Sequence, residues 1–517
     1  MPSSLASQSS NAQVFHLHKS NRASQALLIV AFLFAGFFAV RNIATWPPRL
    51  AYPGEESYEG YPLADIVHMV QGVPIYAPGA ETGFNGGIYG PLYYLAASRF
   101  VNPERPEYFP LRVLSMLGLL GCAACCGVLA YWLSRSYAAA FLAPLVFLSY
   151  RMTTDTGVSA LSDTIALLLF FSAFLWAYRF RNSRAILLAA PLMCLGFYYK
   201  PQYIAGPLAV LLFLAIEKRY KLAAQFSGVL ALVGFGLLGF FQWVVFPGQE
   251  FWRHFLFYQA SLLNWHRFVA GSLIFLFMLA VPVLLSAEYL RRYPDKLLAC
   301  YLACAILLGL ATIGKEGSGV RYFFESVLLI SAFMPALLAK NFAGGTTNGA
   351  AVLLFLISIL CAQAFRRPVP QPSDFASNQA VQNFLRANFP AHSDALGVYP
   401  ADLMQAGLNV PFDDLYDLSR LARRGKLSER GLVNAIRNQH CSVIVLDIDL
   451  NTERDLNRLD YSLTEPVRNV IQTEYELRAR IEAPRPERHW NEPWLYVYVP
   501  RKARPYRVRS NDHRGGF

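Results

Sequence analysis

Long apolar runs are the feature that most limits the fold of this chain. Charged residues lie mostly in the short connectors between these runs. A helix needs about 20 apolar residues to cross a bilayer, so the sequence predicts a polytopic α-helical membrane protein with about 11 transmembrane helices. The runs cover residues 26–43, 111–133, 137–150, 158–178, 185–200, 203–217, 222–246, 268–290, 297–313, 321–339 and 349–365.

The composition and the cysteine positions fit the same class. Charged residues make up 15% of the 517 residues and hydrophobic residues 55%, whereas soluble domains carry about 25% charged residues. The net charge of +12 would suit nucleic acid, but cations in short connectors predict orientation in a lipid bilayer and no nucleic-acid partner. Most cysteines lie in apolar runs, and the CxxCC stretch at 122–126 has no nearby histidine. Close helix packing explains that stretch better than a metal site does.

Lysine and arginine are distributed unevenly between alternate connectors, which predicts the orientation. With the N-terminus inside, the cytoplasmic cations are Lys19, Arg22, Arg135, Arg179, Arg181, Arg184, Lys218, Arg219, Lys221, Arg291, Arg292, Lys296 and Lys340. The opposite connectors hold Arg151, Lys200, Arg253, Arg267 and Lys315. An odd number of spans then places the 44–110 loop and residues 366–517 outside the cytoplasm, in an inner or plasma membrane protein. No small-residue cleavage site follows the first run, so we do not expect a removed signal peptide.

The loop at 44–110 carries three carboxylates, Glu55, Glu56 and Glu59, shortly after the first apolar run. Charges at the edge of a membrane are costly and are therefore usually functional. The alternative is a solvated turn whose acids cap the helix that follows, a stabilisation of about 0.3–1 kcal/mol. Apolar spacing over 60–71 and the stretch at 91–101 predict two short amphipathic helices that lie on the bilayer surface.

Residues 366–517 are expected to form a separate domain, because the composition turns polar after a proline-rich linker at 366–372. Short apolar runs bounded by turn residues predict strands. We expect a helix at 378–388, helices within 418–438, and strands at 393–400, 442–449 and 494–499. The chain thus divides into a transmembrane domain at 1–365 and a small extracytoplasmic α/β domain. The basic stretch at 501–517 is expected to be a solvated tail rather than a lipid or nucleic-acid contact.

Several short motifs follow one another in a fixed order. They are Glu56 and Glu59-Gly60, then Gly72 with Ile75-Tyr76, then Tyr89-Gly90-Pro91-Leu92-Tyr93-Tyr94, Arg112, Asp163, Lys200-Pro201-Gln202 and the stretch from Gly317 to Glu325. In this order they resemble the GT-C superfamily of integral-membrane glycosyltransferases. More narrowly, they resemble the bacterial relatives of dolichyl-phosphate-mannose protein mannosyltransferases (glycosyltransferase family 39). The resemblance covers most of the membrane part, and Arg321 stands where that family usually has Asn.

The resemblance implies that a sugar moves from a polyprenyl-phosphate carrier to an extracytoplasmic acceptor hydroxyl, with inversion. A carboxylate would act as general base, and cations would hold the phosphate of the leaving group. The implied catalytic residues are Glu59, Glu56 and Glu55, with Glu59 slightly preferred; the donor-phosphate ligands are Arg321, Lys200 and Lys315; the substrate-binding residues are Tyr89, Tyr93, Tyr322 and Asp163. The expected partners are the polyprenyl-phosphate-linked donor, a glycan, lipid or protein acceptor, and the bilayer. No metal ligand is assigned, and a divalent cation stays open as a cofactor because carboxylates near a phosphate can bind one.

Two other function classes remain as alternatives: a transporter or flippase of a lipid-linked substrate, and a non-enzymatic envelope assembly protein. A transporter would be expected to show paired halves, but the chain has no internal repeat. Neither class needs an acidic first loop together with outward-facing cations. Single residues also have simpler interpretations: Lys200 and Lys315 as snorkelling anchors, Asp163 as a helix cap, and His254 and His266 as part of an interfacial belt.

Overall fold

The computed structural model describes residues 22–56, 58–77, 80–258, 263–315, 317–343, 349–364, 367–452, 463–483 and 494–501. The predicted basic tail lies outside the described residues except for its first residue. Lys19 and the predicted N-terminal connector before residue 22 also lie outside them.

Each predicted apolar run contains a helix. The helices are α1 (Arg22–Ile43), α5 (Phe109–Ser134), α6 (Tyr137–Ser149), α8 (Asp163–Arg179), α9 (Ala189–Tyr199), α10 (Ala205–Ile216), α11 (Tyr220–Phe240), α12 (Trp265–Arg292), α13 (Lys296–Ile313), α14 (Phe324–Ala343) and α15 (Gly349–Cys361). Within the described residues, 6 helices are long and apolar enough to cross a membrane, and several shorter apolar helices pack beside them. The predicted polytopic α-helical fold is confirmed.

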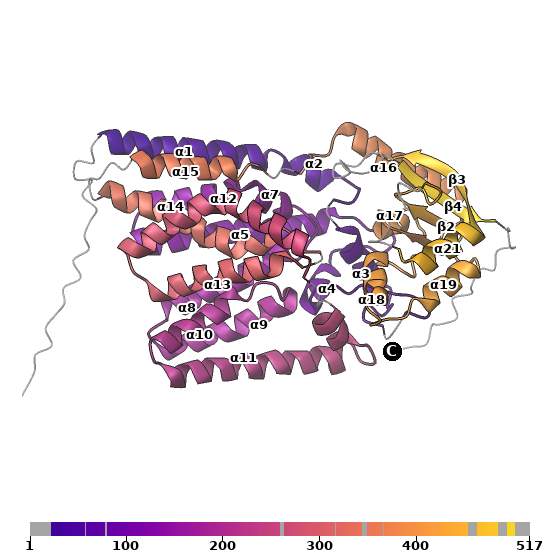
Figure 1. Cartoon of the computed structure of the whole chain (residues 1–517), viewed down its shortest axis with the longest axis horizontal. Coiled ribbons are helices and arrows are strands. Elements are labelled where there is room, and N and C mark those ends of the chain that lie inside the picture. Colours follow the sequence, from indigo (N-terminus) through magenta and orange to yellow (C-terminus); the bar gives the residue numbers. More distant parts are fainter. Residues whose placement is uncertain are drawn as a thin grey trace, which may run out of the picture.

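These helices run side by side along the long axis of the molecule (Figure 1). Helix α14 is central: 89% of the most apolar window of its segment is buried against α5, α6 and α12, whereas only 6% of the α11 window is buried. Helices α1 and α15 lie together along one edge, and α11 lies along the opposite edge (Figure 1). Helix α11 therefore presents most of its apolar surface to lipid.

Short helices in the connectors lie between the membrane helices and the C-terminal domain (Figure 1). They are α2 (Trp46–Ala51), α3 (Gly60–Val70), α4 (Pro91–Ala97), α7 (Arg151–Gly157) and the π-helical turn η3 (Arg253–Tyr258). Helices α3 and α4 confirm the two predicted short helices, but the prediction that the apolar face of α3 lies on the bilayer surface is wrong. Helix α3 packs against α4 and the C-terminal domain, so its polar Asp65 and His68 are buried together with its apolar Ile66.

The C-terminal domain is a small α/β unit, as predicted. Its elements are α16 (Pro372–Asn388), β1 (Ala395–Gly397), α17 (Pro400–Gln405), α18 (Leu415–Arg423), α19 (Arg430–Arg437), β2 (Val443–Leu446), α21 (Glu465–Glu474), β3 (Tyr475–Glu482) and β4 (Trp494–Pro500). The sheet has the order β1-β2-β4-β3, with β1 and β2 parallel and the other pairs antiparallel. Strand β3, an edge strand, was not predicted from the sequence.

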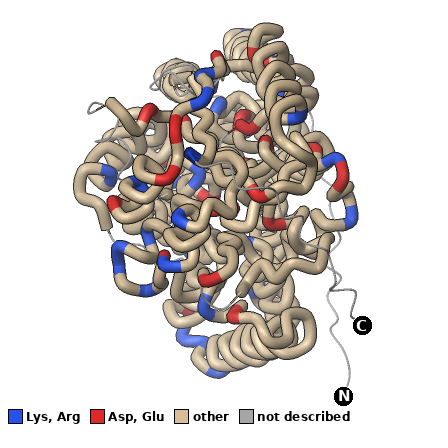
Figure 2. Tube along the Cα trace, turned by 90° about the vertical axis from the view of Figure 1, so that its right-hand side faces the viewer, with Lys and Arg blue, Asp and Glu red and all other residues tan. Residues whose placement is uncertain are grey.

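The C-terminal domain caps one end of the helix bundle, and its sequence-distant contacts fix it there. A parallel bridge joins Phe84 of the first loop to Phe412, and Gln405 donates hydrogen bonds to the carbonyls of Pro53 and Pro106. Viewed onto this end, acidic and basic residues are interspersed (Figure 2). The first loop is therefore held between the two domains.

Candidate functional site

Two buried groups of charged side chains lie where the membrane helices meet the C-terminal domain. We call the first the Asp163 cluster; it consists of Tyr89, Asp163, Lys200, Tyr203 and Arg321. We call the second the Glu59 cluster; it consists of Arg49, Glu56, Glu59, Arg112 and Asp155. Both contain residues that the sequence singled out.

The Asp163 cluster is built from helix ends. Asp163 is the first residue of α8, Lys200 follows the last residue of α9, and Arg321 lies in the 3₁₀ turn η4 (Val320–Phe323) before α14. Asp163 accepts from Lys200 Nζ at 2.7 Å and from Tyr203 Oη at 2.8 Å, and Arg321 Nη1 lies 3.5 Å from it. A helix end can place a polar group beside apolar spans without breaking the helix, so these three segments can converge here.

The electrostatics of this cluster favour an anion. Two cations, Lys200 and Arg321, face one carboxylate, and their side chains are 9% and 17% exposed. Burial is the main cause that lowers the pKa of Lys200 to about 8; Arg321 also lowers this pKa, while Asp163 raises it. The ammonium of Lys200 also lies 4.8 Å from the centre of the Tyr89 ring. An incoming anion would relieve the repulsion between the two cations.

The sequence prediction is only partly matched around this cluster. The structure brings Tyr89, Asp163, Lys200 and Arg321 together, and Tyr322 lies next to Arg321 in η4. Lys315 is different: its backbone pairs with Leu263, and its side chain makes no ion pair or hydrogen bond within the described residues. The structure therefore gives no support to Lys315 as a donor-phosphate ligand, because its loop position leaves it outside the cluster.

Glu59 is held by four donors. Its carboxylate receives two hydrogen bonds from Arg112, through Nε at 3.1 Å and through Nη2, and two more from the backbone N–H groups of Glu56, at 2.9 Å, and Ala160. The side chain is fully buried. Since each carboxylate oxygen already accepts two bonds, no position is left for an acceptor hydroxyl. The slight preference for Glu59 as general base does not fit this geometry.

Arg112 explains why Glu59 is held in this way. Besides Glu59, its guanidinium donates to the carbonyls of Arg49, Tyr52 and Gly54. A guanidinium that donates all five of its N–H groups to one loop restricts the conformation of that loop. The Arg112–Glu59 pair therefore anchors the start of the first loop to helix α5.

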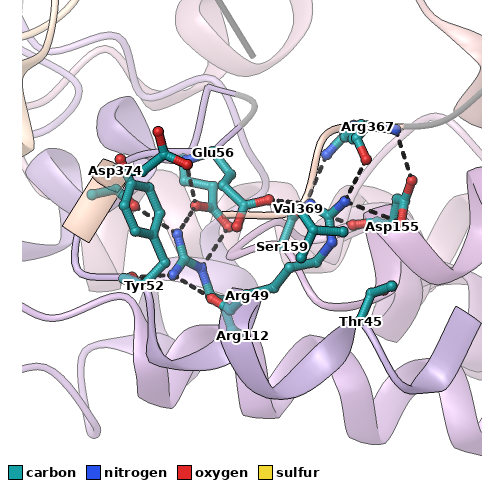
Figure 3. Close-up of polar contacts among 12 residues, drawn as sticks. Thr45, Arg49, Tyr52, Glu56, Arg112, Asp155, Ser159, Arg367, Val369 and Asp374 are labelled. Atoms are coloured by element: carbon teal, nitrogen blue, oxygen red, sulfur yellow. Dashed lines mark hydrogen bonds and ion pairs between the residues drawn. The ribbon is translucent and has the colours of Figure 1, made fainter. Parts of the chain in front are cut away.

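Glu56 has a different environment from Glu59. Its Oε2 accepts from Arg49 Nη1, and Arg49 also lies 3.4 Å from Asp155 and donates to the carbonyl of Arg367 at 2.9 Å. Figure 3 shows Arg49 between these groups, with the linker to the C-terminal domain passing over them. Glu56 is 2% exposed. It is the glutamate that we carry forward as a candidate base.

Glu55 folds back on the start of helix α3. A Cβ atom added at Gly60, the first residue of α3, would collide with the Glu55 carboxylate. This position matches the alternative in which an acid stabilises a helix N-terminus. Glu55 is 8% exposed and is therefore buried rather than solvated.

The two clusters are connected through Tyr93 and the segment before α8. Tyr93 donates to the carbonyl of Ala160 at 2.9 Å, and its ring lies 5.4 Å from that of Tyr89. The N–H of the same Ala160 binds Glu59. Because Ala160 and Asp163 are three residues apart, their Cα atoms lie within about 11 Å of each other. The predicted base loop and the predicted phosphate ligands thus belong to one region.

A third group of buried acids lies between the first loop and the C-terminal domain. Asp413 contacts His68 Nδ1 at 3.1 Å, and Asp65 accepts from Tyr94 Oη at 2.7 Å. Burial raises the pKa of both Asp65 and Asp413 well above the usual range, and lowers the pKa of His68. These groups favour their neutral forms, which suits a packed interface better than a charged binding site.

Other predictions at single residues have mixed outcomes. His254 is buried and contacts the carbonyls of Gly86 and Ala77, so its place in an interfacial belt is wrong, whereas His266 is exposed. Among the described residues no group of three or more His, Cys, Asp or Glu side chains is arranged to hold a metal ion. Sequence analysis missed Arg49, Asp155 and Arg367. A membrane-edge arginine beside an acidic loop was the available signal for Arg49.

Comparison with known proteins identifies the fold. No protein-family model and no curated protein sequence matches the chain. The solved structure of ArnT from Cupriavidus metallidurans bound to undecaprenyl phosphate matches with a TM-score of 0.53 and 11% identity, over 90% of this chain and 97% of ArnT. The apo structure of the same protein matches with a TM-score of 0.51 and 10% identity over the same shares. The chain therefore has the fold of ArnT, and the polytopic helical architecture with a small C-terminal α/β domain predicted from its sequence is confirmed.

Proposed function

We propose that this chain is a membrane glycosyltransferase that moves a sugar from a polyprenyl-phosphate donor to an acceptor hydroxyl outside the cytoplasm. The observation that carries the proposal is the convergence of Lys200 and Arg321 on Asp163, at the end of the helix bundle beneath the C-terminal domain. A buried pair of cations at the end of membrane helices suits a phosphate attached to a lipid chain. The fold shared with ArnT, whose structure contains undecaprenyl phosphate, supports the same donor class.

The donor phosphate is proposed to lie against Lys200 and Arg321. A guanidinium can donate to two phosphate oxygens at once, whereas an ammonium acts as a point charge. Asp163 serves as their counterion before the donor arrives, which explains why two cations can be held so close together. Tyr89 and Tyr93 lie between the Asp163 cluster and the Glu59 cluster. They are proposed to bind the sugar, together with Tyr322.

The transfer itself is proposed to be a single displacement. The acceptor oxygen attacks the anomeric carbon while the bond from that carbon to the phosphate oxygen breaks, so the configuration inverts. Glu56 takes the proton of the acceptor hydroxyl, and the polyprenyl phosphate leaves with its charge held by Lys200 and Arg321. Glu55 is the alternative base, since Glu59 is occupied by Arg112.

The positive charges that neutralise the donor phosphate can come from lysine and arginine side chains of this chain. Each carboxylate of the Asp163 and Glu59 clusters is ion-paired with a lysine or arginine: Asp163 with Lys200, Glu59 with Arg112, and Glu56 and Asp155 with Arg49. A divalent cation, which the sequence left open, would have to displace one of these pairs. We therefore propose that the donor phosphate is neutralised by side chains.

Mass spectrometry of cell-envelope glycans tests the proposed function and identifies the sugar. Cells with the gene deleted should lose one sugar modification, which wild-type protein restores and the Arg321→Gln variant does not. The exposed substitution Arg386→Gln in the C-terminal domain is the matched control and should restore it. Unchanged glycans after deletion, or full restoration by Arg321→Gln, would contradict the proposal.

A further inference from the structure

Two cations of the C-terminal domain donate hydrogen bonds to one loop of the membrane domain, the loop that contains η3. In helix α18, Arg420 Nη2 donates to the carbonyl of Tyr258 at 3.0 Å, and shortly after this helix Lys426 Nζ donates to the carbonyl of Phe257 at 3.0 Å. Both acceptors lie at the end of the π-helical turn η3.

The same loop touches both segments that carry the cations of the Asp163 cluster. Phe255 of η3 stacks on Tyr198 with ring centres 5.4 Å apart, and Tyr198 lies two residues before Lys200. Farther along the loop, Leu263 pairs with Lys315, six residues before Arg321. Arg420 is therefore attached to the part of the structure that borders the proposed phosphate site.

The guanidinium of Arg420 is buried and has a donor that its contact with the loop does not use. Its side chain is 7% exposed and pairs with Asp417 at 3.0 Å, yet within the described residues its Nε–H has no hydrogen-bond partner. A buried donor of a charged group is costly when it lacks an acceptor. The charge of Arg420 also acts on Tyr322, the neighbour of Arg321. Lys426, in contrast, is exposed in the same contact.

We propose that Arg420 is a third donor-binding cation, supplied by the C-terminal domain, and that it binds the anionic headgroup of the lipid-phosphate donor beside Arg321 and Lys200. This inference rests on the proposed function of the Asp163 cluster. It adds a residue that lies 99 positions beyond Arg321 in the sequence. The C-terminal domain then forms one wall of the donor site, and donor binding strengthens its contact with the membrane domain.

The test is a titration of the full-length protein with undecaprenyl phosphate, followed by native mass spectrometry in detergent. Arg420→Gln should weaken binding by about tenfold or more, because it removes a charge-assisted hydrogen bond. Lys426→Met is the matched control: it removes the neighbouring docking bond but not the buried charge, and it should bind within about twofold of wild type. Arg420→Lys keeps the charge without the fork and should fall between the two.

The outcomes separate this inference from the function on which it rests. Binding by Arg420→Gln equal to that of wild type overturns the role of Arg420 and leaves the proposed function standing. An equal loss in Arg420→Gln and Lys426→Met also overturns it, because the effect would then come from docking alone. Failure of wild-type protein to bind undecaprenyl phosphate overturns both. Thermal unfolding of each variant, measured alongside, gives the temperature below which it is folded, and binding is measured below that temperature. Arg420→Gln should lower the midpoint, because it removes an ion-pair partner of buried Asp417.

Discussion

The carboxylates of this site differ in how many of their hydrogen-bond positions are filled by donors inside the protein. Glu59 accepts four hydrogen bonds from donors inside the protein, whereas Asp163 is shared by two cations, Lys200 and Arg321. A saturated carboxylate maintains structure, and a shared one can exchange partners when substrate binds. This distinction separates the residues of the first loop more clearly than their order in the sequence does.

Glutamine substitutions should distinguish Glu56, the proposed general base, from Glu59, which has a structural role. Glu56→Gln should lower turnover by about 10²–10⁴, because a general base is lost. Its thermal midpoint should fall less than that of Glu59→Gln, because Arg49 keeps Asp155 as a counter-charge. Glu59→Gln should instead destabilise the protein by about 3–5 kcal/mol, since buried Arg112 loses its counter-charge. Turnover and thermal unfolding of both variants, with Glu55→Gln beside them, provide the measurement. A stable, inactive Glu59→Gln protein together with an active Glu56→Gln protein would reverse the assignment.

Lys200 should make donor binding depend on pH. Its pKa is lowered to about 8, mainly by burial, so the empty site loses this positive charge as the pH rises above about 8. The bound phosphate keeps Lys200 protonated, because it binds only the charged ammonium. The affinity for the donor should therefore be nearly constant from about pH 7 to 8. Above that pH it should fall, approaching tenfold per pH unit. Lys200→Arg stays charged, and its affinity for undecaprenyl phosphate should stay flat to about pH 9.5. Parallel curves for the two proteins would show that Lys200 does not hold the phosphate.

At the scale of elements, the site depends on how closely helix ends approach one another. Gly90, which precedes α4, donates its N–H to the carbonyl of Tyr199 at the end of α9. A Cβ atom at Gly90 would collide with the backbone carbonyl of Tyr198. This approach sets the distance between Tyr89 and Lys200.

Gly90→Ala should therefore weaken both the fold and the site. The overpacking should cost about 1–3 kcal/mol, and donor affinity should fall because Tyr89 moves away from Lys200. Gly36→Ala in α1 is the control: a Cβ atom there meets nothing within 4 Å, and alanine inside a helix should be about 0.5–1 kcal/mol more stable than glycine. Thermal unfolding of the two variants tests this. A Gly90→Ala protein as stable as wild type would show that the approach of α4 to α9 is not required.

The sequence predicts elements well where one physical signal dominates. Apolar runs located the membrane helices. Asp163, Lys200 and Arg321 were expected from the resemblance to a known family, and the structure places all three at helix ends. The amphipathic pattern of α3 was misleading, since a helix between two domains buries its polar face as well. Strand β3 was missed, although its alternation of exposed charged residues with less exposed apolar residues is typical of a half-buried strand.

The contacts that complete the site could not be predicted from one sequence. Arg112 and Glu59 are 53 residues apart, and His68 and Asp413 are 345 apart. No local pattern specifies such pairs, because hydrogen-bond partners depend on how the elements pack. For the same reason the sequence placed Arg367 in a linker, although its backbone N–H binds Asp155 at 3.0 Å.

At the scale of the whole molecule, orientation follows from the connector charges, which predict the C-terminal domain and the first loop outside the cytoplasm. A cysteine at Tyr58, which is 65% exposed, and another at exposed His440 should react with an impermeant maleimide on intact spheroplasts. A cysteine at exposed Lys221 should react only after permeabilisation. Labelling at position 221 but not at positions 58 and 440 in intact spheroplasts would show that the orientation is the opposite of the predicted one.

The central claim is that Lys200 and Arg321 hold the phosphate of a lipid-linked donor. Cryo-electron microscopy of the full chain in a lipid nanodisc with undecaprenyl phosphate tests it directly. The account predicts phosphate density within about 3 Å of Lys200 Nζ and the Arg321 guanidinium, which is ordinary hydrogen-bond distance, with the lipid chain leaving toward the bilayer. Phosphate density at Arg49 and Arg112 instead, with the Asp163 cluster unchanged, would contradict it.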